Sequence, residues 1–294
     1  MRSFIVLAMV GLAAQLVDGA LGMAYGVTSQ SLLLTVVGLT PALASASVHM
    51  AEVGTTLASG VSHWRFGNVD WSKVGWLAVP GGIGAFLGAV VLSSVISAEA
   101  AEPIVAIFLF LLGAYVLARF AFNRSTNVVE NLPIPRAFLS PLGLVAGFLD
   151  AVGGGGWGPI STPTLLSSGR MEPRKVVGTV DTSEFVVALC ASIGFLISLS
   201  FAQVPWGVVG AILIGGLIAA PIAAWIVRHL NARVLGTAVG GFILLVNANT
   251  FLGAVGLNPE LNIIVYVAIL AVWITALYFA IAAIRRERKP VVET

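Results

Sequence analysis

The chain has 294 residues, of which 58% are hydrophobic and only 10% are charged, and its mean hydropathy is +1.01. Soluble globular proteins carry about a quarter charged residues, so this composition excludes soluble enzymes, DNA-binding modules and secreted disulfide scaffolds. With 33 glycines among so many Leu, Val, Ile and Ala, the chain is expected to be an all-α polytopic membrane protein. The net charge of +2 suggests no nucleic-acid partner.

Apolar stretches follow one another along the whole chain. About 20 apolar residues are needed to cross roughly 30 Å of hydrocarbon. Two stretches, 3–37 and 137–169, are too long for one span and are interrupted by glycine clusters, so we expect a broken helix or re-entrant hairpin in each. In chain order, the spans expected between and after them are 42–62, 74–97, 103–122, 174–200, 205–227, 233–252 and 261–284.

The cationic residues predict the orientation. All of the fifteen Lys and Arg residues except Arg2 fall on alternating loops or on the C-terminal tail, which the positive-inside rule places in the cytoplasm. We therefore expect a multi-pass protein of the cell (inner) membrane with a cytoplasmic C-terminus and an external N-terminus.

The two interrupted stretches are copies of one another. Sliding the chain along itself until Asp18 meets Asp150 superimposes Asp, Glu, Pro and Gly in one register, and a slightly longer displacement then aligns Trp71 with Trp206. The matched pairs of the first register include Gly22 and Gly154, Ser29 and Ser161, Pro41 and Pro173, and Glu52 and Glu184. An odd number of crossings between the copies inverts the second, and inverted repeats with broken helices are typical of secondary transporters.

This repeat divides the chain into four parts. Repeat 1 is 1–124, with hairpin 3–37 and three spans, and a cytoplasmic linker follows at 125–136. Repeat 2 is 137–255, with hairpin 137–169 and three spans. Residues 256–294 form an extra transmembrane helix and a basic cytoplasmic tail.

The second glycine-rich segment resembles the TauE/SafE family of sulfite exporters. The resemblance is most specific from Gly143 to Asp150, leading into Gly153 to Pro159 and then Pro163. The first copy departs from the family pattern, because Gly22 to Val27 has fewer glycines and no proline. Membership implies transport of sulfite, a sulfonate or a related small organic anion.

The glycine run is the first candidate for binding that anion. Glycine lets backbone approach a ligand closely, and N–H groups at a helix N-terminus bind anions without a basic side chain. The alternative is close helix packing. The candidate substrate-binding residues are Gly22, Tyr25, Ser29, Gln30, Gly153, Gly154, Gly155, Gly156, Trp157, Ser161 and Thr162.

Asp18 and Asp150 precede the two breaks at equivalent places. An ionisable group in the bilayer costs at least ~2.5 kcal/mol on insertion scales, so a functional or structural reason is expected for each aspartate. One reason is a proton-coupling or cation site, and the other is capping of backbone N–H groups at the break.

Further ionisable residues lie on the spans after the hairpins. His49 and Glu52 are three residues apart on one helix, and Asp181 and Glu184 are their repeat counterparts. Inversion would place the two faces opposite each other, with His49 and Asp181 as a titratable pair. The alternative is a static pair of interhelical hydrogen bonds.

The same residues are the candidates for proton coupling. No Lys or Arg lies within 3–64 or 176–227 to balance their carboxylates, and burial disfavours the charged form. The candidates are Asp18, His49, Glu52, Asp150, Asp181 and Glu184.

Two secondary features have simpler explanations. Asn247, Asn249 and Thr250 are expected to form helix–helix hydrogen bonds in preference to lining a path. The tryptophans are typical of membrane-interface anchors, except Trp157, which lies inside the glycine run and is a candidate gate.

Other function classes find little support. No protease motif and no Gly-x4-Gly-Lys-[Ser/Thr] run is present, so no enzyme, no cofactor and no metal site is expected. A channel and a non-transporting assembly factor stay open as alternatives. The expected partners are a small anionic solute and the lipid bilayer, and self-association into a homo-oligomer is left open.

Overall fold

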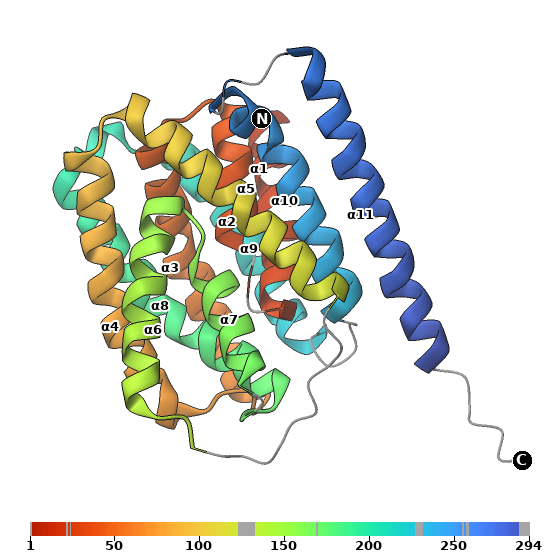
Figure 1. Cartoon of the computed structure of the whole chain (residues 1–294). Coiled ribbons are helices and arrows are strands. Elements are labelled where there is room, and N and C mark those ends of the chain that lie inside the picture. Colours follow the sequence, from red (N-terminus) through yellow and green to blue (C-terminus); the bar gives the residue numbers. More distant parts are fainter. Residues whose placement is uncertain are drawn as a thin grey trace, which may run out of the picture.

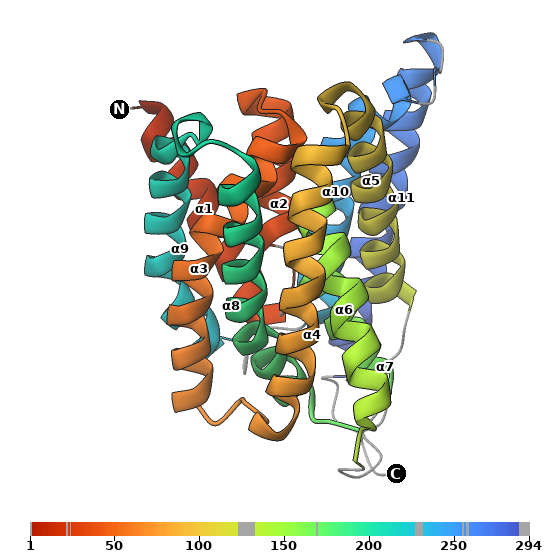
Figure 2. The same cartoon turned by 90° about the vertical axis from the view of Figure 1, so that its left-hand side faces the viewer.

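A computed structural model of the chain describes residues 2–21, 23, 25–122, 133–168, 170–226, 232–254, 256 and 259–287. All regular structure in these ranges is helical, as the composition predicts, and the helices run roughly side by side (Figures 1 and 2). The elements are α1 (Arg2–Leu21), α2 (Tyr25–Leu32), the π-helical turn η1 (Leu33–Val37), α3 (Pro41–Arg65), α4 (Trp71–Val90), the π-helical turn η2 (Val91–Val95), α5 (Ala98–Phe122), α6 (Arg136–Gly153), α7 (Trp157–Ser167), α8 (Pro173–Ser198), the 3₁₀ turn η3 (Phe201–Gln203), α9 (Trp206–Ile226), α10 (Ala232–Ala254) and α11 (Pro259–Glu287).

Six helices of the described part are long and apolar enough to cross a membrane, which makes this a multi-pass membrane protein. They are Trp71–Val95, Pro103–Ala121, Arg136–Gly153, Arg174–Ser198, Trp206–Trp225 and Asn262–Ala283. The α3 helix is not among them, although its 25 residues extend about 37 Å at 1.5 Å per residue. Its buried face carries serine, threonine, histidine and glutamate side chains, which lower its hydropathy.

Both long interrupted stretches are broken helices. In the first, α1 ends at Leu21 and α2 begins at Tyr25; in the second, α6 ends at Gly153 and α7 begins at Trp157. α1 begins and η1 ends at one end of the bundle, whereas α6 begins and α7 ends at the other (Figures 1 and 2). Each stretch thus enters and leaves at the same end of the bundle, as a re-entrant hairpin does.

Glycines set how closely the hairpins approach their neighbours. α1 packs along α9, and α6 packs along α4. A Cβ on Gly11 would strike the carbonyl oxygen of Ile212, and a Cβ on Gly143 would strike that of Leu77. These two contacts are equivalent in the repeat. The register that matches Asp18 with Asp150 also matches Gly11 with Gly143. The register that matches Trp71 with Trp206 also matches Leu77 with Ile212.

Two more contact pairs obey the same two registers. A Cβ on Gly19 would lie 2.6 Å from the Cβ of Ala223, and one on Gly88 would lie 3.1 Å from the Cβ of Ala151. Likewise Trp157 packs on Gly81, and Tyr25 packs on Gly216. In each pair, residues of one half of the chain contact the other half, so the two halves are interleaved.

The loops that carry the described cations gather at one end of the bundle. α3 ends at Arg65, α4 begins at Trp71, α6 begins at Arg136 and α8 begins at Pro173, all at the end where α11 finishes (Figures 1 and 2). The sequence prediction that cations lie on alternate loops therefore agrees with the arrangement of the helices. Arg124, Arg228, Arg288, Lys289 and the linker residues 125–132 lie outside the described residues.

The last helix stands apart from the rest. α11 contacts α10 and α5, and only 11% of its apolar segment is buried. It follows the outside of the bundle in Figure 1. This fits the absence of a repeat counterpart for this segment in the sequence.

Candidate functional site

The two helix breaks meet inside the bundle. A Cβ on Gly26 would lie 2.6 Å from the Cα of Gly155 and 3.0 Å from the carbonyl oxygen of Gly154. On its other side the same Cβ would lie 3.2 Å from Oε1 of Glu52. Gly22, the repeat counterpart of Gly154, lies outside the described residues, and the contact between the breaks is seen at Gly26.

Glycine is required at the second break by conformation as well as by space. Gly154 has φ +69° and Gly155 has φ +155°, values that residues with a side chain rarely adopt. A Cβ on Gly154 would also strike the side chain of Gln30, and one on Gly155 would strike the backbone of Val27.

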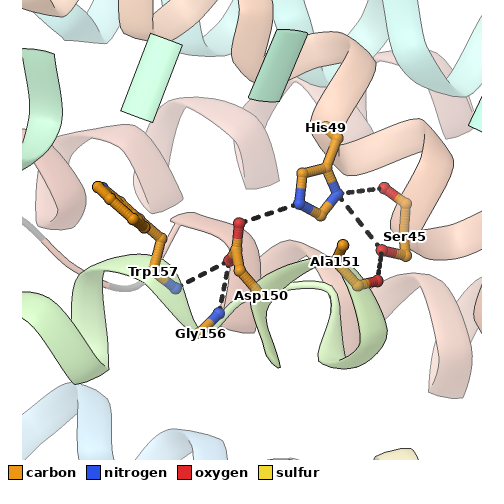
Figure 3. Close-up of polar contacts among 6 residues, drawn as sticks. All are labelled: Ser45, His49, Asp150, Ala151, Gly156 and Trp157. Atoms are coloured by element: carbon orange, nitrogen blue, oxygen red, sulfur yellow. Dashed lines mark hydrogen bonds and ion pairs between the residues drawn. The ribbon is translucent and has the colours of Figure 1, made fainter. Parts of the chain in front are cut away.

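Asp150 accepts the hydrogen bonds of the N–H groups at this break (Figure 3). Its Oδ1 accepts hydrogen bonds from the N–H of Gly156 at 2.6 Å and of Trp157 at 2.9 Å. Its own carbonyl oxygen accepts from Gly154 at 2.6 Å and from Gly155 at 3.1 Å. The expectation that the N–H groups of 154–157 face a solute is therefore wrong in this structure, because the aspartate is already the anion at this helix N-terminus.

His49 completes the second break. Its Nε2 lies 3.0 Å from Oδ2 of Asp150, and its Nδ1 lies 2.8 Å from the carbonyl oxygen of Ser45. A carbonyl and a carboxylate both accept hydrogen bonds, so the arrangement fits a ring that donates from both nitrogens, the imidazolium. Ser45 also bonds to the carbonyl oxygen of Ala151 at 2.7 Å, which ties α3 to the end of α6 (Figure 3).

The expected pairing of His49 with Asp181 is thus wrong. Helices from the two halves of the chain do contribute the pair, but the partner is Asp150 of the hairpin and not Asp181 of α8. The physical reason is that α3 packs on the end of α6, so its histidine reaches the capping aspartate first. Asp181 lies instead near His63, with Oδ2 4.0 Å from Nε2.

A cluster of three carboxylates lies at the first break. One oxygen each of Asp18, Asp181 and Glu184 lies within 4.8 Å of the others, and all three side chains are buried. Two unit charges at such a distance repel by about 3 kcal/mol at an effective dielectric constant of about 20. The three groups therefore cannot all be ionised unless a proton or another cation is bound among them.

Asp18 caps its own break as Asp150 does. The N–H of Tyr25 donates to Oδ1 of Asp18 at 3.4 Å, at the place of the Trp157 bond to Asp150. The capping alternative is therefore confirmed for both aspartates. It does not exclude coupling, because Asp18 also belongs to the carboxylate cluster and its Oδ2 has no hydrogen-bond donor among the described residues.

Several other polar groups near the breaks are buried without a hydrogen bond. Buried polar groups normally have a partner, and an orphan marks a place for water, an ion or a ligand. Within the described ranges, the side chains with such atoms near the two hairpins are Gln15, Ser29, Gln30, Glu52, Ser59 and Ser161.

The aromatic residues of the breaks serve as anchors. Trp157 is fully buried, and its Nε1 donates to the carbonyl oxygen of Val180 at 3.0 Å. The Tyr25 hydroxyl donates to the carbonyl oxygen of Ile212 at 3.2 Å. Each hydrogen bond fixes the start of a short helix against a long one.

The remaining polar residues near the breaks have different outcomes. Thr162 is buried beside Ser161 in α7. Asn247 bonds to Ser31 at 2.8 Å, which confirms the expected helix–helix hydrogen bond at this residue. Gln15, Ser45 and Asn68 were missed; the spacing of Gln15 from Asp18 and of Ser45 from His49, three and four residues on one helix, could have revealed two of them.

Comparisons with known proteins agree with the architecture. The model of the family described as "Sulfite exporter TauE/SafE" matches residues 7–250. The chain belongs to the TauE/SafE family. This membership makes it a membrane transporter, consistent with its six apolar helices and its broken hairpins.

One curated relative of this TauE/SafE protein is named "Probable membrane transporter protein YtnM" and comes from Bacillus subtilis (strain 168). It is 53% identical over 285 residues, which cover 97% of this chain and 94% of the relative. No solved structure matches the chain.

Proposed function

We propose that this TauE/SafE protein is a secondary active transporter that exports a small anion such as sulfite, a sulfonate or a related organic anion, coupled to protons. The observation that carries the proposal is the contact of two broken helices, Gly26 against Gly155, among buried ionisable side chains. Broken helices that meet near the middle of a bundle are where secondary transporters bind solute and coupling ion.

The architecture supports carrier function further if the halves are inverted repeats. Repeat 1 would comprise 1–124 and repeat 2 would comprise 137–255, joined by the linker 125–136, with 256–294 as the extra helix and tail. In support, the hairpins open toward opposite ends of the bundle, and three pairs of cross-half contacts follow the two registers of the sequence repeat. Such a pair of halves can rock about a shared centre.

The orientation follows from the charges. The described cationic loops lie at the end of the bundle where α11 finishes, and this end would face the cytoplasm. Hairpin α6–α7 would then open to the cytoplasm and hairpin α1–α2 to the outside. The C-terminus would be cytoplasmic and the N-terminus external, in the cell membrane.

We assign solute binding to the polar side chains at the two breaks. With the N–H groups of 154–157 held by Asp150, the buried side-chain donors of α2 and α7 that no described residue engages are the hydroxyls of Ser29 in α2 and Ser161 in α7. Both short helices point their N-termini, which carry partial positive charge, at the place where the breaks meet. The Tyr25 hydroxyl and the Trp157 indole are held by Ile212 and Val180, so these two side chains would line the site without donating to the anion. The other residues proposed for the site are Gln30, Thr162, Gly22 and Gly153 to Gly156.

We assign proton coupling to the buried ionisable groups around the same place. Glu52 faces the contact of the two breaks with both oxygens free of hydrogen bonds from described residues, and Glu184 is its repeat counterpart. A proton on such a carboxylate removes the repulsion that an entering anion would meet. Asp18, Asp150, Asp181 and His49 complete the set through the contacts given above.

The test is counterflow in proteoliposomes. Vesicles containing purified protein are loaded with unlabelled sulfite, a sulfonate or a carboxylate, and uptake of the labelled anion is followed. A carrier should give transient, saturable accumulation of label against its gradient. Non-saturable flux without counterflow would indicate a channel, and no flux of any of the three anions would leave the assembly-factor alternative.

A further inference from the structure

The two breaks differ at one charged position. The register that carries Asp18 onto Asp150 also carries His49 onto Asp181. At the second break His49 lies against Asp150 at 3.0 Å. The equivalent pair at the first break is Asp181 and Asp18, which do lie together in the carboxylate cluster. An imidazole therefore balances one capping aspartate, whereas a second carboxylate faces the other.

The first break lacks the positive charge that this geometry needs. No Lys or Arg occurs in 3–64 or 176–227, the stretches that contain all three carboxylates. Asp18 lies in the last turn of α1, whose negative dipole offsets the positive end of α2 that this aspartate caps. Oδ2 of Asp18, both side-chain oxygens of Asp181 and Oε2 of Glu184 accept no hydrogen bond from any described residue.

Two further buried polar side chains are near this cluster: Ser59 lies against Asp181, and Gln15 lies one turn from Asp18 along α1. Ser59 is fully buried, and its hydroxyl faces the Asp181 carboxylate without a hydrogen bond of normal geometry. Gln15 is fully buried one turn before Asp18, on the same face of α1, and neither polar atom of its amide has a partner among the described residues. Serine and glutamine oxygens are ligands of hard cations.

We infer that Asp18, Asp181 and Glu184, with Ser59 and Gln15, bind a hard monovalent metal cation, for which Na⁺ is the probe. The cation supplies at the first break the single positive charge that His49 supplies at the second. All of these ligands offer oxygen, which selects hard metals over soft ones. The sequence left a cation site open at Asp18 but did not indicate this set of ligands, because they come from α1, α3 and α8 and have no common spacing.

Monovalent charge fits this place better than divalent charge. A monovalent cation takes the place of the imidazolium, and a proton can hold a further carboxylate of the cluster neutral, so charge balance needs no divalent ion. Mg²⁺ sheds its water reluctantly, and Ca²⁺ takes six to eight oxygen ligands, more than the five buried side chains offer with one oxygen each. Ca²⁺ and Mg²⁺ therefore serve as comparison ions in the test.

His63 does not replace the cation. Its Nε2 is 4.0 Å from Oδ2 of Asp181, whereas its Nδ1 lies 3.2 Å from the amide nitrogen of Asn68. An amide nitrogen donates, so Nδ1 accepts and the ring proton sits on Nε2, which describes a neutral imidazole. The titratable side chains that act on the cluster are thus its own Asp18, Asp181 and Glu184, this neutral His63, Glu52, and Asp150 with its partner His49.

The test measures binding to purified full-length protein without any anionic solute. Thermal unfolding is followed by tryptophan fluorescence in NaCl and in choline chloride at equal ionic strength and pH. A saturable rise in Tm with Na⁺ is expected, since a tenfold excess of ligand over its Kd shifts the folding equilibrium about tenfold. Asp181→Asn and Ser59→Ala should lose the rise. Ser62→Ala should keep it, because the Ser62 hydroxyl bonds to Ala58 of its own helix.

A charge-replacement variant gives the second measurement. In the variant Asp181→His, a histidine would lie beside Asp18, as His49 lies beside Asp150. This variant should fold with a Tm that no longer responds to Na⁺. Equal Tm values in Na⁺ and choline for the wild type, an unchanged response in Asp181→Asn or Ser59→Ala, or a response to Ca²⁺ or Mg²⁺ alone would overturn the inference. Dependence on pH without dependence on any metal would identify the charge as a proton. Anion counterflow is measured separately, so failure of one proposal leaves the other standing.

Discussion

Asp150 is the residue that organises the second break. One side chain and its carbonyl satisfy four successive N–H groups, and the same carboxylate binds His49 of the other half of the chain. Removing one partner of a buried ion pair costs about 3–5 kcal/mol, because the other charge stays buried without compensation. The local turn and the contact between halves therefore depend on one group.

A double-mutant cycle tests this dependence. Asp150→Asn should lower the free energy of unfolding by about 3 kcal/mol or more, while Asp150→Asn combined with His49→Gln should lose less than the sum of the two single changes. Chemical or thermal unfolding in detergent measures the terms. Glu172→Gln is the control: its ion pair with Arg174 is solvent-exposed, and its loss should cost at most about 1 kcal/mol. Strict additivity of the two buried changes would show that the pair is not coupled.

The glycines at the contact of the breaks are not equivalent to other glycines. Gly155→Ala should reduce both Tm and transport, because the new Cβ would strike Val27 and the residue would have to keep φ +155°. The matched control is Gly210→Ala in α9, where a Cβ would meet nothing within 4 Å. There alanine should stabilise the helix by up to about 1 kcal/mol. Equal Tm values for the two variants would contradict the close approach of the breaks.

At the scale of elements, each broken helix is held by a long helix of the other half. The Tyr25 hydroxyl at the start of α2 donates to a carbonyl oxygen of α9, and the tyrosine ring packs on Gly216, which is also in α9. Trp157 at the start of α7 bonds to α8 and packs on Gly81 of α4. Short helices of eight and eleven residues are marginal by themselves, so these tertiary anchors position them.

Cysteine labelling tests whether the hairpins open to opposite sides of the membrane. In a Cys190→Ala background, Thr40→Cys follows the first hairpin and Glu172→Cys follows the second. A membrane-impermeant maleimide added to intact cells should label Thr40→Cys, whereas Glu172→Cys should react only after permeabilisation. Labelling of both from the same side would contradict the inverted repeats.

At the scale of the molecule, the buried acidic residues outnumber the buried histidines. Asp18, Glu52, Asp150, Asp181 and Glu184 are buried together with His49 and His63, and no Lys or Arg lies between 3 and 64 or between 176 and 227. An anion can reach this centre only if positive charge accompanies it. Net movement of solute is therefore expected to be linked to movement of protons or cations.

Neutral replacements separate exchange from driven transport. Glu52→Gln and Glu184→Gln keep the side-chain shape and remove the ionisable group, so each should still exchange anion for anion but lose accumulation driven by a pH gradient. Proteoliposome uptake with and without an imposed gradient measures the difference, and Gly210→Ala provides a matched control expected to retain both activities. Full pH-driven accumulation in both glutamine variants would rule these carboxylates out as proton carriers.

The sequence by itself determined the membrane class, the helices, the two breaks and the displacement that relates them. These depend on composition and on local patterns: apolar length gives a span, and clustered glycines with an aspartate four residues earlier give a capped break. The position of most candidate residues near the breaks followed from the same patterns.

Only the tertiary structure decided which charged groups meet. His49 bonds to Asp150, 101 residues away, and Asp18 joins Asp181 and Glu184 across two helices; no spacing along the chain encodes these partners. They depend on how closely α3 approaches α6 and α1 approaches α8, which the small residues and hydrogen bonds between helices determine. For the same reason the N–H groups that looked open to a solute in the sequence are held by an aspartate in the folded protein.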